Sequence, residues 1–126
     1  MRHSIAVLAA LLLSLTAAMA TGAQSSQAVQ TMAGLLMSLH HFPSDSDKQA
    51  LLQITQDKSA TADERTVAQA MIDVQHTAAA ADEPGLQAII GSDKAAASVK
   101  TLADVVLNFH HMVPEGDKAK LQALTQ

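Results

Sequence analysis

The chain has 126 residues, and 12 carboxylates against 8 Lys and Arg give it a formal net charge of −4. Because nucleic acids and anionic membranes are bound through concentrated positive charge, we expect neither as a partner. Cys is absent, which excludes disulfides, thiolate catalysis and cysteine-based metal sites.

Residues 1–20 have the pattern of a secretory signal peptide. Arg2 precedes an apolar run over residues 5–13, and Ala18-Met19-Ala20 then forms a small-x-small cleavage pattern. A second apolar run of membrane length does not follow, so we expect no membrane insertion after cleavage. The pattern predicts an exported product, periplasmic or secreted, with residues 21–126 forming a single helical repeat domain.

Most of the chain after residue 24 consists of three copies of one segment. Residues 25–56, 60–91 and 95–126 align at a constant offset of 35 residues without a gap. A fixed period of this size is typical of helical repeat architectures. The columns that are identical in all three copies are Thr31/Thr66/Thr101, Ala33/Ala68/Ala103, His41/His76/His111, Asp47/Asp82/Asp117 and Leu51/Leu86/Leu121.

Each copy is predicted to form a helix, a turn and a second, shorter helix. In the first copy Val29, Met32, Leu36 and Leu39 follow one another at spacings of three and four, which place them on one helix face. Apolar side chains recur at spacings of three and four in the other two copies. We therefore expect an all-α protein of three tandem αα-hairpins, stacked as a short α-solenoid or, alternatively, closed into a compact six-helix bundle.

Several residues mark where the helices should begin and end. Ser26 and Thr61 are suitable N-caps, and Thr61 with Glu64 fits the capping box. The first and third copies carry Pro or Gly after the histidine column, whereas the middle copy does not. We therefore expect the first helix of the middle copy to continue to about Ala81, and that of the third copy to start early, at Asp93.

Histidine is the residue type that most readily suggests chemistry. Imidazole is a good ligand for copper and zinc, so His40, His41, His110 and His111 are candidate metal ligands of a periplasmic metal-binding protein. Equivalent residues of stacked hairpins lie about 8–10 Å apart, however, whereas zinc ligands lie about 2.0–2.1 Å from the ion. A row of histidines at helix spacing would reach one ion only if the turns fold inward.

The histidine column has a second, structural interpretation. Each of its members follows a first helix, where imidazole can interact with unpaired carbonyl groups, and the invariant Asp six residues later falls where the next helix starts. A His–Asp bridge across each turn would join the two helices of a hairpin. The predicted structural turn locks are His41–Asp47, His76–Asp82 and His111–Asp117, and we prefer them to a metal site.

A polar stripe on each first helix offers a possible partner surface. If the hairpins stack, the three stripes should align into one mixed polar face that can bind another protein. The stripes consist of Gln30, Gly34, Ser38 and His41; Arg65, Gln69, Asp73 and His76; and Lys100, Asp104, Asn108 and His111.

The sequence contains no recognisable enzyme motif. Phosphate-binding glycine loops, serine nucleophile elbows and the H-E-x-x-H zinc motif are all missing. We therefore expect an exported, non-catalytic helical-repeat protein that acts as a protein-interaction or scaffold module without a cofactor. The alternative is a copper- or zinc-binding protein of the periplasm that uses the paired histidines.

Overall fold

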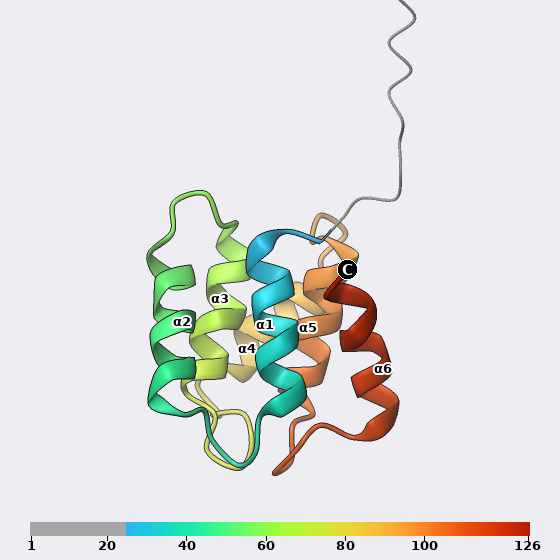
Figure 1. Cartoon of the computed structure of the whole chain (residues 1–126). Helices are drawn as coiled ribbons and strands as arrows, with labels where there is room; N and C mark the ends of the chain where they lie inside the picture. Colours follow the sequence, from blue (N-terminus) through green and yellow to red (C-terminus); the bar gives the residue numbers. More distant parts are fainter. Residues whose placement is uncertain (1–24) are drawn as a thin grey trace, which may run out of the picture.

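A computed structural model describes residues 25–126, so the predicted signal peptide lies outside the described residues. This part of the chain is all-helical (Figure 1). Its helices are α1 (Gln27–Ser38), α2 (Asp45–Gln56), α3 (Ala62–Ile72), α4 (Glu83–Gly91), α5 (Ala97–Leu107) and α6 (Glu115–Leu124). The prediction of an all-α fold made of three αα-hairpins is confirmed. Within residues 25–126, no helix has the length and apolarity needed to cross a membrane.

The three hairpins close into a ring. Helices α1, α3 and α5 contact one another in the centre, and each second helix packs against the first helix of the next copy: α2 on α3, α4 on α5 and α6 on α1. The last of these contacts joins the final helix to the first, which an open stack would keep apart. Of the two arrangements expected from the repeat, the compact six-helix bundle therefore describes the ring (Figure 1).

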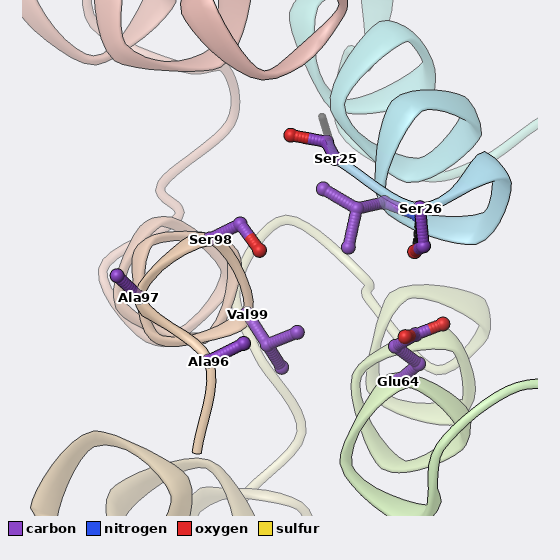
Figure 2. A pocket seen from close by; sticks show the side chains of 8 residues that line it. Ser25, Ser26, Glu64, Ala96, Ala97, Ser98 and Val99 are labelled. Atoms are coloured by element: carbon purple, nitrogen blue, oxygen red, sulfur yellow. Dashed lines mark hydrogen bonds between the residues drawn. The ribbon is translucent and has the colours of Figure 1, made fainter. Parts of the chain in front are cut away.

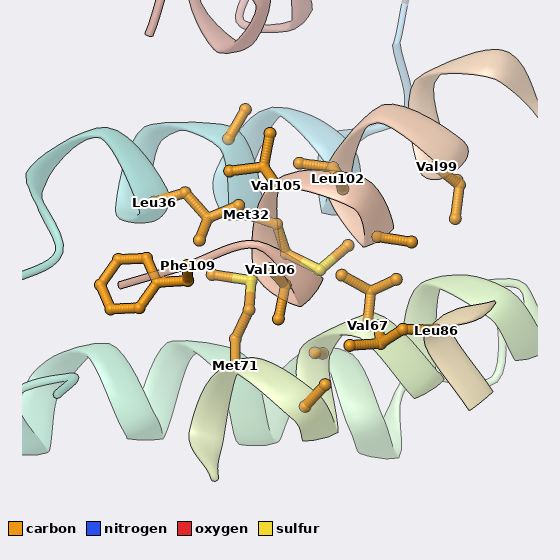
Figure 3. Packing of buried hydrophobic residues seen from close by; sticks show 14 of the residues in the cluster. Met32, Leu36, Val67, Met71, Leu86, Val99, Leu102, Val105, Val106 and Phe109 are labelled. Atoms are coloured by element: carbon orange, nitrogen blue, oxygen red, sulfur yellow. The ribbon is translucent and has the colours of Figure 1, made fainter. Parts of the chain in front are cut away.

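The core consists of repeat-equivalent layers along the central axis. Met32, Val67 and Leu102 are fully buried and occupy the same place in their copies, and Leu36 and its equivalents form another layer (Figure 3). The invariant leucines Leu51, Leu86 and Leu121 are also fully buried. The sequence pattern identified these positions because apolar side chains at spacings of three and four must share one helix face.

Helix ends agree with the sequence in some places and differ in others. Ser26 and Thr61 accept hydrogen bonds from the third amide of their helices, as predicted for N-caps. The predicted capping box at Thr61 is only half formed, because the Glu64 amide donates to Thr61 but the Glu64 side chain does not return the bond. A full capping box forms instead between Ser44 and Asp47 at α2.

Two predicted helix extensions are wrong. Helix α3 ends at Ile72 rather than near Ala81, and α5 begins at Ala97 rather than at Asp93. The middle copy lacks a Pro or Gly after its histidine, yet its first helix ends one residue earlier in the repeat than that of the first copy. The turn at His76 is therefore fixed by contacts with the other two turns, and these contacts are the basis of the candidate site.

Candidate metal centre

The turns after α1, α3 and α5 meet at the same end of the bundle, at the bottom of Figure 1. Each turn carries one member of the invariant histidine column, and all three have positive φ: 62° at His41, 64° at His76 and 65° at His111. In residues 25–126 these are the non-glycine residues with positive φ. A non-glycine residue in this region costs about 1–2 kcal/mol, so the same strained conformation is present in every copy.

A closed ring of backbone hydrogen bonds holds the three turns together. The amide of His41 donates to the carbonyl of His111 at 2.7 Å, that of His76 to His41 at 2.5 Å, and that of His111 to His76 at 2.6 Å. In two of the turns the residue after the histidine also bonds to the residue before it, as in a γ-turn. The Phe42 amide donates to the His40 carbonyl, and the Met112 amide donates to the His110 carbonyl. The strained conformation is thus fixed by contacts between copies.

The same turns direct the three imidazole rings toward one another. The Nδ1 atoms of His41, His76 and His111 are mutually 3.2 Å apart, forming an equilateral triangle. Ring centroids lie 5.1–5.3 Å apart, and the ring planes are inclined to one another by 63–74°. Each ring therefore meets its two neighbours in an edge-to-face arrangement. Ligands from all three copies therefore converge on one point.

This triangle has the dimensions of a three-histidine metal site. Zinc–nitrogen bonds are about 2.0–2.1 Å long, so an ion bonded to all three Nδ1 atoms would lie about 0.9 Å out of their plane. The angles between its bonds would then be about 103°, close to the tetrahedral value. The three ring nitrogens lie within the separation expected of atoms that share an ion. The fourth position would face solvent, because all three histidines are exposed.

Hydrogen bonding alone cannot satisfy the three ring nitrogens. A neutral imidazole has one N–H group, so its Nδ1 atom is either a donor or an acceptor. Each of the three Nδ1 atoms contacts the other two, so at least one of the three contacts must join two donors or two acceptors. If the protons lie on the Nε2 atoms, the three Nδ1 lone pairs face one another, and a shared cation is the species that can interact favourably with all of them.

Electrostatics favour the neutral imidazole at one corner of the triangle, His111. Partial loss of water, followed by the positive charge of His110, His76 and His41, lowers the pKa of His111 below its ordinary value. Metal ligation requires the neutral ring. Crowding three imidazoles together therefore keeps at least His111 in its ligating form.

The histidines that converge in the structure are not the four candidate ligands that the sequence suggested. His41 and His111 belong to the triangle, but His40 and His110 do not, and His76 takes the third place. The ring of His110 stands edge-on against that of His111, with centroids 4.5 Å apart. Pairing within the sequence does not predict this convergence, because it is equivalent residues of the three copies that come together.

The predicted turn locks are not formed. In residues 25–126, no hydrogen bond or ion pair joins any of the three histidines to the invariant Asp of its own hairpin. Asp47 accepts from the Ser44 amide in the capping box, and Asp117 pairs with Lys120 at 3.3 Å. The left-handed backbone conformation turns each imidazole toward the axis and thus away from the next helix.

Asp82 differs from its two equivalents. It precedes α4 without capping it, and its Oδ2 atom is buried without a hydrogen-bond partner among the described residues. Burial, and then the neighbouring carboxylate of Asp73, raise the pKa of Asp82 to about 6. The carboxyl group is therefore a local source of instability at neutral pH.

Sequence reasoning missed His76 as a candidate ligand although the signal was available. The histidine column is identical in all three copies, and yet its members are exposed. The invariant apolar columns, which are Ala33 and Leu51 with their equivalents, are buried. Packing in the core therefore does not explain why the same exposed residue occurs in every copy. Three copies, each with one histidine, supply the ligand number of an open zinc site.

No protein family model, curated protein or solved structure matches this chain.

Proposed function

We propose that this protein binds one divalent transition-metal ion, zinc or copper, through the Nδ1 atoms of His41, His76 and His111. The observation that carries the proposal is the triangle of Nδ1 atoms 3.2 Å apart. Imidazole nitrogen is a preferred ligand of both metals. This function is the metal-binding alternative considered from the sequence, with a ligand set drawn from three repeats.

Backbone strain supports the same function. Positive φ at a non-glycine residue persists only where the surrounding structure imposes it, and such residues cluster at functional sites. Here the strain occurs three times and each time directs an imidazole to the axis. A purely structural turn would be formed at lower cost by Gly or Asn.

The open side of the site suits reversible binding. Three neutral ligands leave the charge of the ion uncompensated, and an exposed fourth position is left for water or an exchangeable ligand. Structural zinc sites are usually closed by four protein ligands. We therefore propose metal capture and transfer, in the periplasm or outside the cell if residues 1–20 direct export.

A protein-interaction module was the function preferred from the sequence. It required the polar stripes of the first helices to align into one face, as they would in an open stack. In a closed ring, α1, α3 and α5 are arranged around a common axis, so their exposed sides point in different directions. This arrangement favours the metal site over the interaction surface.

Metal analysis of untagged protein tests the proposal. We expect one zinc or copper ion per chain and, with Co²⁺ as a spectroscopic probe, the visible absorption of tetrahedral cobalt. Because the chain has no Trp or Tyr, protein concentration is best measured by amino-acid analysis. Failure to bind any of the three ions at micromolar concentrations would refute the proposal.

Two variants locate the site. His76→Asn removes one ligand at a position where Asn tolerates the left-handed conformation. It should weaken binding by more than about 100-fold, since the loss of a mere hydrogen-bond partner of a ligand already costs about 10–100-fold. His40→Asn is the matched control, because His40 is an exposed histidine outside the triangle, and the affinity of this variant should stay unchanged. Equal losses in both variants would contradict the assigned ligand set.

A further inference from the structure

The opposite end of the central axis carries a second feature, a hollow of about 300 Å³ where α1, α3 and α5 begin. Ser25, Ser26 and Ser98 line it together with Glu64 and apolar residues (Figure 2). The starts of α1, α3 and α5 lie at the top of the bundle in Figure 1, while the turns that carry the histidines lie at the bottom. The hollow is therefore separate from the metal site.

Glu64 is the unexpected member of this hollow. Its equivalents in the other copies are Val29 and Val99, which line the same space and are buried. Glu64 is only 6 % exposed, and it is the buried charged residue of the described chain. A carboxylate thus replaces a valine at one of three equivalent positions around the axis.

The carboxylate of Glu64 has no protein partner among the described residues. The capping-box bond to the start of α3 is not formed. Among residues 25–126, no ion pair or side-chain hydrogen bond includes its oxygens. Its oxygens are not closed off from solvent, because the buried side-chain oxygen without a partner in the described residues is Asp82 Oδ2. The carboxylate is therefore free to accept hydrogen bonds from a ligand in the hollow.

The lining of the hollow specifies the chemistry of such a ligand. The Glu64 carboxylate offers negative charge and hydrogen-bond acceptors, and the hydroxyl groups of Ser25 and Ser98 offer further acceptors. Val29 and Val99 supply apolar walls. A primary ammonium group, with three N–H donors on an aliphatic stem, fits this combination.

We propose that this hollow binds a primary ammonium group through Glu64. Two sources carry that chemistry, a free amine and the α-amino group created when the predicted signal peptide is removed. A chain starting at Thr21 would have its ammonium four residues before Ser25, a reach of at most about 14 Å. Since Ser25 lines the hollow, this reach allows the new terminus to fold back to Glu64.

The test compares chains that start at Thr21 with a free or an acetylated α-amino group, each prepared both with the original sequence and as the Glu64→Gln variant. If the terminus is the ligand, acetylation should lower the Tm of the original chain by at least about 4–8 °C, the shift that the loss of one typical hydrogen bond produces in a domain of this size. It should leave the Tm of Glu64→Gln unchanged. Because the measured quantity is the Tm difference within each variant, an effect of the substitution on folding does not change its interpretation.

Glu83→Gln is the matched control, because Glu83 is an exposed glutamate in the first turn of α4. This variant should respond to acetylation like the original chain.

Adding methylamine or putrescine to the acetylated chains distinguishes the second source. A rise in Tm that needs Glu64, without an effect of acetylation, assigns the hollow to a free amine. The proposal is overturned if neither acetylation nor added amine changes the Tm in a Glu64-dependent way. A Glu64-dependent rise with Ca²⁺ or Mg²⁺ alone would also overturn it.

Discussion

The amide of His41 donates to the carbonyl of His111 at 2.7 Å, although 70 residues separate them in the sequence. This bond joins the first copy to the third and completes the ring of turns. A metal ion bound to the same histidines would cross-link all three copies at one point. Binding should therefore stabilise the whole bundle.

We expect zinc to raise the Tm in a manner that depends on its concentration. At a free zinc concentration about 100 times the Kd, the gain in unfolding free energy is about 2.7 kcal/mol if only the folded state binds. Thermal melts followed by far-UV circular dichroism measure this directly. The same rise in His76→Asn would show that zinc acts elsewhere on the surface.

Replacing His76 tests its backbone conformation independently of metal. Because glycine adopts positive φ without steric cost, His76→Gly should be about 1 kcal/mol more stable than His76→Ala in metal-free protein. Urea unfolding with chelator present gives both values. Gln69 is an exposed helical control, where the order should reverse, since glycine in a helix interior costs about 1 kcal/mol relative to alanine. A more stable alanine variant at both positions would contradict positive φ at His76.

Stability should depend on pH through Asp82. Its folded-state pKa of about 6 lies above the ordinary value of 3.8, so the folded state holds the proton longer than the unfolded state does. Stability from this group is therefore greatest below about pH 4 and is lost as the pH rises through about 6. Asp82→Asn should stabilise the protein at about pH 7.5, by about 1 kcal/mol or less because the group is partly exposed, and should have less effect at about pH 4.

The neighbouring carboxylate supplies a check on that explanation. Asp73→Asn should lower the pKa of Asp82, and combining it with Asp82→Asn should give less than the sum of the two separate gains. Urea unfolding at both pH values measures each gain in unfolding free energy. Additive effects would show that Asp73 does not act on Asp82.

Ala68 tests the close packing of the central helices. It is fully buried, as are Ala33 and Ala103, and Ala68→Leu adds three carbons where no space is available. Overpacking of this kind costs about 1–3 kcal/mol. Ala88→Leu, at an exposed position of α4, is the control and should change stability little. Unchanged stability of Ala68→Leu in chemical unfolding would argue against the tight contact.

The sequence predicts the hairpins well because a 35-residue period and apolar spacing of three and four depend on short-range helix geometry. It predicts the core for the same reason, as Met32, Val67 and Leu102 show. Closure of the ring depends on contacts between residues far apart in the chain, such as α6 with α1. No local pattern encodes such a contact.

The convergence of the three histidines was not predicted for a related reason. Positive φ is usually predicted from a Gly or Asn in the sequence, and the three positions with positive φ are histidines instead. With ordinary backbone at these positions, equivalent side chains would stay a helix spacing apart, as we expected from the sequence. The inward turn that brings them together is produced by the backbone ring between copies.

Closure of the ring also sets how many copies the protein can have. The apolar flank of each hairpin is covered by the next one, and α6 covers α1, so no hairpin is left as an end. An open array can grow by gene duplication, one unit at a time. In this molecule a fourth hairpin would have no uncovered apolar surface to pack against, and its histidine would have no place in the triangle. Further evolution of the chain should therefore proceed by divergence within the three copies.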